Sequence, residues 1–224
     1  MSNRPRAGIL AYGSLQVDPG AEIDAATVER IPVTTPFPVE YARSSGTRAG
    51  APTLVPVPEG LGTPVQAQIL LMRPDMSDYL VADMLYRRET NRVGDFSVQY
   101  DKDAQQKKRD PVLVKKVQDL SGVPYVFYIW LAPNLDVVLD DGRTDAAKAA
   151  HLADLAMRSV TAGTYPAGRD GIRYLADAIR HGIRTPLTEH YGAEVLRLAC
   201  DAPDLEKARL RVARQKGITP GEEQ

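Results

Sequence analysis

The sequence predicts an α+β fold in which a small sheet precedes a set of helices. Up to about residue 140 the apolar residues gather in short runs separated by glycine and proline, which is typical of strands. After Asp141-Gly142 the apolar spacing changes to the three and four residues of a helix face. Apolar residues make up 43% and charged residues 25% of the chain, so a substantial core can form. We expect a single domain over residues 1–224, with residues 8–140 mostly sheet and residues 144–217 helical.

Strands are expected throughout the first part of the chain. Gly8 to Tyr12 is a short apolar run that stops at a Gly-Ser turn signal. Residues 32–64 are rich in proline, which favours sheet edges and strand starts, so we interpret this stretch as part of a twisted sheet. The polar residues 101–110 are expected at an exposed hairpin tip. The expected strands are residues 8–12, 39–43, 53–57, 65–72, 96–100, 112–117 and 123–131.

Helix starts are predicted where a capping residue precedes an apolar stripe. Pro74 to Ser77 form such a signal for a helix that runs to Glu89. Thr144 precedes an alanine-rich helix that continues through Val160. Further helices are expected over residues 172–179, from Thr185-Pro186 onward, and from Pro203 to Lys216.

Charge and cysteine content exclude several classes of protein. The 28 basic and 29 acidic side chains leave a net charge of −1, which gives no overall attraction to nucleic acid or to an anionic membrane. Cys200 is the only cysteine and cannot form an intramolecular disulfide, which favours a reducing compartment. The apolar run that ends at Tyr12 is too short for a signal-peptide core or a membrane span. We therefore expect a cytoplasmic protein.

A basic cluster and three histidines offer alternative sites. The cluster suggests a nucleic-acid patch, but acidic residues are interspersed and aromatic residues are absent from it, which favours a solvated loop. The histidine spacing places no two side chains on one helical turn, so no metal and no other cofactor are expected. The basic cluster comprises Lys102, Lys107, Lys108, Arg109, Lys115 and Lys116, and the histidines are His151, His181 and His190.

Two motifs carry a resemblance to a known family. Tyr12-Gly13-Ser14-Leu15, at the end of the first strand, resembles the Tyr-Gly-Ser-Leu signature of gamma-glutamylcyclotransferase-like proteins. Leu85-Tyr86-Arg87-Arg88-Glu89, at the end of a helix, is similar to the segment that bears the catalytic glutamate of that family. The strand order and the spacing between the two motifs also agree with the family.

The resemblance extends in patches over roughly residues 8–200. The strands around Thr53 and Val65 resemble the paired strands of the family. The helical tail around Tyr174 and Gly182 is similar to the glutathione-degrading, ChaC-like branch. That branch often has glycines and an aromatic residue soon after the glutamate, whereas this chain has Thr90-Asn91-Arg92. The departure weakens the link to glutathione more than the link to the reaction class.

The resemblance implies a fold, a reaction and a site. The fold is a small mixed sheet, strongly bent or barrel-like, with surrounding helices and a helical C-terminal extension. The reaction releases 5-oxoproline from a gamma-glutamyl amide or peptide, by attack of the substrate's α-amine on its own γ-carbonyl carbon. Glu89 is then the general acid and base, and the turn binds the glutamyl head. The binding residues are Tyr12, Gly13, Ser14 and Leu15, through turn amides suited to an anion.

The surroundings of Glu89 decide how well it can carry protons. Partial burial is expected to raise the pKa of a glutamate toward neutrality, whereas a cation beside it opposes that shift. We therefore predict that Arg87 and Arg88 either face away from Glu89 or bind an anionic substrate.

Three alternatives remain open from the sequence. The first is a non-catalytic member of the same fold that binds a small molecule. The second is a hydrolase with Ser14 as the nucleophile, although the Gly-x-Ser-x-Gly pattern is missing. The third concerns the aromatic residues around Trp130. They are expected in the core, but Tyr125 or Tyr128 can instead reach a pocket from a facing strand.

Overall fold

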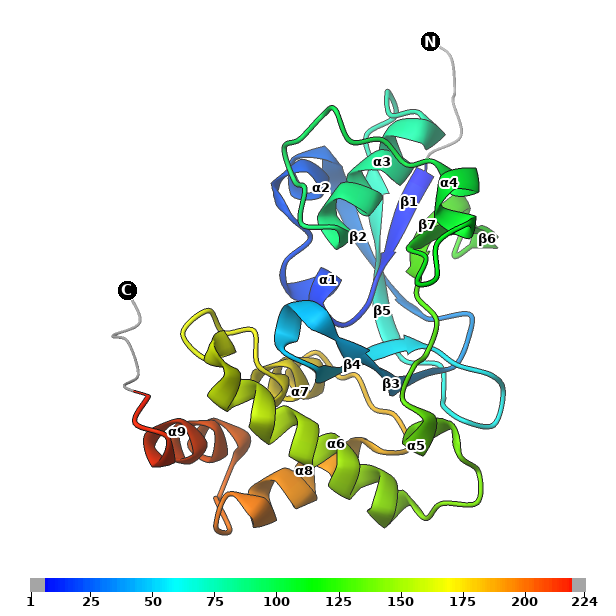
Figure 1. The fold of residues 1–224 in the computed structure, drawn as a ribbon. Helices are drawn as coiled ribbons and strands as arrows, with labels where there is room; N and C mark the ends of the chain where they lie inside the picture. Colours follow the sequence, from blue (N-terminus) through cyan, green and yellow to red (C-terminus); the bar gives the residue numbers. More distant parts are fainter. Residues whose placement is uncertain (1–6, 219–224) are drawn as a thin grey trace. The chain divides into compact units, whose positions relative to one another are not determined.

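The structure is a computed structural model that describes residues 7–218, and the chain divides into two compact units (Figure 1). The first, here the sheet unit, combines residues 1–36 with residues 66–132. The second, the hairpin-helix unit, combines residues 37–65 with residues 133–224. Each unit is thus built from two separate stretches of the chain, which the sequence patterns did not indicate. The single domain expected for residues 1–224 stays a prediction.

The sheet unit contains a five-stranded mixed sheet in the order β2-β5-β1-β7-β6. The central strand β1 is antiparallel to β5 and parallel to β7, and the remaining neighbours are antiparallel. A mixed α+β architecture is therefore confirmed. The strands are β1 (Ala7–Ala11), β2 (Thr27–Thr34), β5 (Gln66–Met72), β6 (Leu113–Leu120) and β7 (Val123–Trp130).

Strand β1 lies at the centre because it has no polar side chain to keep in water. All five of its residues are buried. Gly8 pairs with Leu71 on one side and with Val126 on the other. A Cβ atom at Gly8 would lie 2.4 Å from Cγ2 of Ile69, so a larger residue would force a shift in the sheet.

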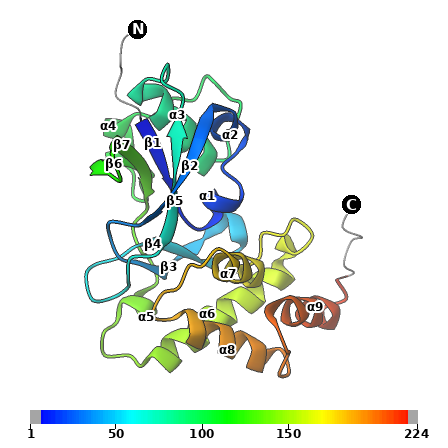
Figure 2. The same cartoon turned by 180° about the vertical axis from the view of Figure 1, so that it is seen from behind.

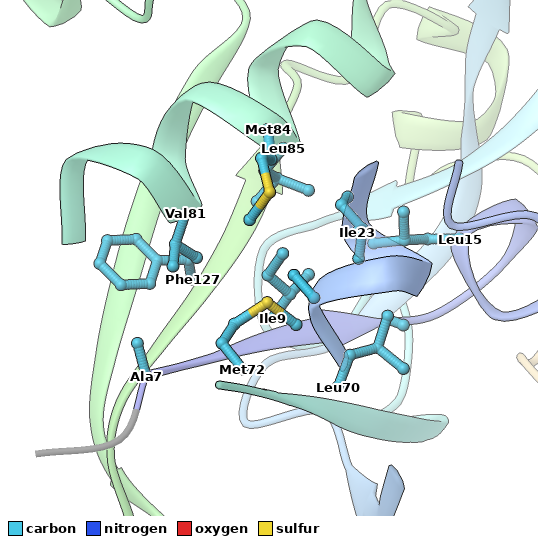
Figure 3. Packing of buried hydrophobic residues seen from close by; sticks show 12 residues of the cluster. Ala7, Ile9, Leu15, Ile23, Leu70, Met72, Val81, Met84, Leu85 and Phe127 are labelled. Atoms are coloured by element: carbon cyan, nitrogen blue, oxygen red, sulfur yellow. The ribbon is translucent and has the colours of Figure 1, made fainter. Parts of the chain in front are cut away.

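Four helices accompany this sheet, and one of them carries Glu89. Helix α3 begins at Ser77, whose side chain accepts a hydrogen bond from the Leu80 amide at 3.3 Å, as the capping signal predicted. Its inner face, with Val81 and Leu85, packs with Ile9 and Phe127 in one apolar cluster (Figure 3). Burying each such side chain contributes ~1.5–3 kcal/mol. The helices are α1 (Ser14–Val17), α2 (Ala21–Ala26), α3 (Asp78–Glu89) and α4 (Lys102–Gln106).

Three expectations for this unit were wrong in detail. Residues 96–100 form no strand, and Phe96 is 74% exposed. The expected hairpin tip at 101–110 contains α4 instead, capped by Asp101 through the Ala104 amide. Strand β2 was missed because it is an edge strand with mostly exposed side chains and a proline at position 32, so it lacks an apolar pattern.

The hairpin-helix unit pairs two strands and covers them with helices (Figure 2). Strands β3 and β4 are antiparallel and are joined through a 3-10 turn, Gly46–Arg48. Helices α6 and α7 contact β4, and α9 contacts α7 and α8. Helix α8 begins at Thr188, later than Thr185-Pro186 predicted. The elements are β3 (Val39–Ser45), β4 (Ala51–Pro56), α5 (Asp136–Leu139), α6 (Asp145–Ser159), α7 (Gly171–Arg180), α8 (Thr188–Leu198) and α9 (Leu205–Gln215), and the backbone is kinked within Val160–Thr164.

Two buried charged groups hold this unit together. Asp170 caps α7 through the Arg173 amide and accepts a 2.7 Å hydrogen bond from Arg209 of α9. Glu40 of β3 is fully buried and accepts hydrogen bonds from Thr185 Oγ1 at 2.6 Å and from the Leu187 amide at 3.2 Å. Charged groups removed from water in this way need partners, and both have them.

Candidate functional site

The turn after β1 is held in a conformation that requires glycine. Gly13 has φ 58° and ψ −134°, a region that residues with a Cβ atom rarely adopt. The short helix α1 then begins at Ser14, and the Gln16 amide donates to the Gly13 carbonyl at 3.2 Å. The side chain of Leu15 belongs to the apolar cluster of the sheet unit. Tyr12 is half-buried at the start of the turn.

The side chain of Gln16 fixes this turn to the sheet. Its Nε2 donates to the carbonyls of Ala11 and Gln66, at 3.3 and 3.2 Å. Buried amide groups of this kind contribute mainly by leaving no polar atom unpaired. The four residues of the Tyr-Gly-Ser-Leu motif are therefore rigidly placed at the end of β1.

Arg88 connects this turn to Glu89. Its Nη2 donates to Ser14 Oγ at 3.2 Å, and its Nε and Nη2 donate to the Asp18 carbonyl at 3.1 and 2.8 Å. Its Nη1 lies 3.5 Å from Oε2 of Glu89, the last residue of α3. The side chains of Arg88 and Glu89 are 16% and 26% exposed. Ser14 and Glu89, 75 positions apart in the sequence, thus meet at one guanidinium group.

The two arginines before Glu89 differ in direction. Arg87 points to Glu22 of α2, with which it forms a buried ion pair, and it also donates to the Val98 carbonyl at 3.0 Å. Burial opposes ionisation of Glu22, but hydrogen bonds from Arg87 and from the Gly94 amide outweigh it and lower the pKa of Glu22. The prediction that both arginines face away is wrong for Arg88. The other part of that prediction, that Arg88 binds an anionic substrate, is not affected and stays a prediction.

Thr90-Asn91-Arg92, where the chain departs from the family pattern, ends helix α3. Thr90 Oγ1 donates to the Tyr86 carbonyl at 2.8 Å, and Asn91 has a left-handed φ of 55°. The Arg92 amide then donates to the Arg87 carbonyl at 2.7 Å. This arrangement satisfies carbonyls at the end of the helix, so the three residues have a structural use next to Glu89.

A separate groove of about 860 Å³ lies elsewhere on the sheet unit. It is lined by the start of α3, the start of α4 and the facing parts of β6 and β7, and it contains none of the predicted site residues. Tyr79, which lines this groove, is 84% exposed. No sequence signal indicated this groove, because its walls come from four elements.

Two members of the basic cluster, both on β6, lie beside aromatic side chains of strand β7. Nζ of Lys115 is 4.1 Å from the ring centre of Trp130, and Nζ of Lys116 is 4.3 Å from that of Tyr125. Trp130 is only half-buried, so its expected place in the core was wrong. Lys116 also pairs with Asp78 at 3.6 Å. That the cluster is a solvated loop and binds no nucleic acid stays a prediction.

The described residues offer neither a metal-binding cluster nor a membrane-spanning helix. Within residues 7–218, no group of three or more His, Cys, Asp or Glu side chains has an arrangement suited to a metal ion. The three histidines belong to the hairpin-helix unit, whereas Ser14 belongs to the sheet unit. Over the same described residues, no helix combines the length and the hydropathy needed to cross a lipid bilayer.

Comparisons of this chain with protein families, with curated proteins and with solved structures gave no match. Membership of the gamma-glutamylcyclotransferase-like family therefore stays a prediction, made from the resemblance of the motifs around Gly13 and Glu89.

Proposed function

We propose that this chain is a gamma-glutamyl cyclotransferase that releases 5-oxoproline from a gamma-glutamyl amide or peptide. The observation that supports this best is that Ser14 and Glu89 both contact the guanidinium of Arg88, beside the turn at Gly13. A substrate held by the turn therefore lies within reach of the Glu89 carboxylate. The specific cyclotransferase fold, with its bent or barrel-like sheet, is part of the same proposal.

The reaction needs little from the protein besides positioning and proton transfer. The α-amine nitrogen forms a bond with the γ-carbonyl carbon, and the bond from that carbon to the leaving amine breaks. Well-oriented intramolecular attack has an effective molarity of up to ~10⁵–10⁸ M, so folding the substrate supplies much of the rate. Glu89 takes a proton from the α-ammonium and delivers it to the leaving nitrogen, a role worth ~10²–10⁴-fold.

A second candidate is a non-catalytic binding protein with the same turn. The contact between Arg88 and Glu89 favours it, because a carboxylate paired with a cation is a weaker base. In that case the turn still binds a carboxylate, but no 5-oxoproline is formed.

The test is to measure 5-oxoproline released from a panel of gamma-glutamyl amides and peptides, glutathione included. We expect wild type to form it and Glu89→Gln to lose ~10²-fold or more of the rate. Glu29→Gln, an exposed glutamate of β2, is the matched control and should keep full activity. Turnover by wild type and Glu89→Gln at equal rates refutes the role of Glu89. If the folded protein releases 5-oxoproline from none of the compounds, the cyclotransferase proposal is refuted, and the non-catalytic binding protein is the remaining candidate.

A further inference from the structure

The guanidinium of Arg88 is positioned as a docking point before any ligand arrives. Three hydrogen bonds, one to Ser14 Oγ and two to the Asp18 carbonyl, fix its Nε and Nη2 edge against the turn. The side chain is 16% exposed, so it is shielded from bulk water without being sealed off. These bonds use the N–H of Nε and both N–H groups of Nη2, so the two N–H groups of Nη1 remain to donate to a carboxylate.

The contact between Arg88 and Glu89 is the weakest that this guanidinium makes. Its 3.5 Å length compares with ~2.7–2.9 Å for a strong charge-assisted hydrogen bond. The two residues are neighbours in a helix, where adjacent side chains do not face each other, so the geometry cannot tighten without distortion. Arg87 and Glu22, which approach from different helices, show what a well-formed pair in this unit looks like. An incoming carboxylate can therefore replace Glu89 on Arg88.

We infer that Arg88 binds the α-carboxylate of the substrate and that this carboxylate displaces Glu89 from the guanidinium. The inference rests on the proposed function and assigns to Arg88 the selection of substrates by their free α-carboxylate. The α-amine is attached to the same carbon as that carboxylate. A substrate seated on Arg88 and Ser14 therefore presents its amine to the place where Glu89 lies.

The exchange also activates the catalytic base. Once the substrate's carboxylate neutralises Arg88, Glu89 loses the cation that favoured its ionised form and accepts a proton more readily. A substrate without the α-carboxylate leaves Glu89 paired with Arg88. Discrimination against such compounds then appears in kcat as well as in KM, because binding and activation depend on the same group.

The test compares two substrates that undergo the same cyclisation. Gamma-glutamyl anilide yields 5-oxoproline, whereas 4-aminobutyryl anilide lacks the α-carboxylate and yields 2-pyrrolidinone. We expect Arg88→Gln to lose about 10- to 100-fold in kcat/KM on the first, as loss of a charged hydrogen-bond partner predicts. On the second it should lose nothing or gain, because position 88 then holds no cation beside Glu89. Arg88→Lys, which keeps the charge without the fork, should fall between.

Arg92→Gln is the matched control, because Arg92 is 63% exposed and pairs only loosely with Asp95 at 4.0 Å. It should not change either substrate's kcat/KM. An equal loss on both anilides in Arg88→Gln and Arg88→Lys would show that Arg88 only holds the turn in place, and would overturn the inference. Unchanged activity of both variants on the glutamyl compound would overturn it as well.

A binding measurement tests the role of Arg88 independently of catalysis. If wild type turns over neither the anilides nor any compound of the gamma-glutamyl panel, the cyclotransferase proposal fails, and calorimetric titration with 5-oxoproline and 2-pyrrolidinone decides about Arg88. Binding of 5-oxoproline that is lost in Arg88→Gln and kept in Arg92→Gln supports a carboxylate site at Arg88. Absence of binding to wild type, or equal binding by wild type and Arg88→Gln, rejects it.

Discussion

Glu40 should make the hairpin-helix unit less stable as the pH rises toward neutrality. Its carboxyl is fully buried and accepts hydrogen bonds from the Tyr41 amide, Thr185 Oγ1 and the Leu187 amide. Burial raises the pKa of Glu40 to about 7 because these hydrogen bonds only partly replace water, and the charge of Asp145 adds to the shift. The Thr185 hydroxyl also lies 3.0 Å from the Thr188 hydroxyl, so the carboxyl belongs to a small buried hydrogen-bond network.

The magnitude follows from the difference between the folded and the unfolded protein. The unfolded chain ionises this carboxyl near 4.5 and the folded protein near 7. Between these values the folded protein keeps a proton that the unfolded chain has released, so a rise in pH favours unfolding. At ~1.36 kcal/mol per pH unit, the free energy of unfolding falls by about 3 kcal/mol across the window. The raised pKa of Glu40 therefore adds its full contribution to the free energy of unfolding below pH 4.5 and adds nothing above pH 7.

Urea denaturation followed by circular dichroism at 222 nm, at pH 5 and pH 8, measures this change for wild type and Glu40→Gln. Glutamine cannot titrate, so the variant should lack ~2–3 kcal/mol of the pH dependence of wild type. Its amide nitrogen also faces the Leu187 amide, so its stability at pH 5 should be lower. Glu59→Gln, on an exposed loop of the same unit, should behave as wild type. Equal pH dependence of Glu40→Gln and wild type would refute this account.

Two further substitutions test the buried ion pair and the glycine turn. Arg209→Met leaves Asp170 buried without its cation, and thermal and urea unfolding should show a loss of ~3–5 kcal/mol; a loss below 1 kcal/mol would mean that Asp170 finds another partner. Gly13→Ala forces a Cβ atom into a glycine-only conformation and should cost ~1–3 kcal/mol, measured by urea denaturation followed through Trp130 fluorescence. Unchanged stability there would contradict the conformation of the turn.

Features set by local hydrogen bonds were predictable from the sequence. Ser77 and Thr144 cap their helices as expected, since a capping side chain reaches only three residues ahead. The apolar strand β1 was equally clear, because its residues must be buried wherever they lie. The edge strand β2 was not, since its place in the sheet comes from pairing with β5 and not from its own pattern.

Residues 96–100 show how distant contacts override local preference. Their composition suggests a strand, but Arg87 binds the Val98 carbonyl and Asp83 accepts from the Tyr100 amide, which hold the segment against α3. The same limit applies to the candidate site. The two motifs indicated which residues to compare, but the direction of Arg88 depends on the Asp18 carbonyl, 70 positions away, which no sequence pattern reports.

The interleaved path of the chain has a consequence for its synthesis. Residues 37–65 leave the ribosome between the two halves of the sheet unit, yet they belong with helices that are made later. When residue 132 has emerged from the exit tunnel of the ribosome, the sheet unit can fold, while β3 and β4 still lack α6 and α7. The nascent chain therefore carries an uncovered apolar hairpin, including Val39, Tyr41 and Val55, until its last third is translated. A chaperone that acts on this protein during translation should be needed in that interval.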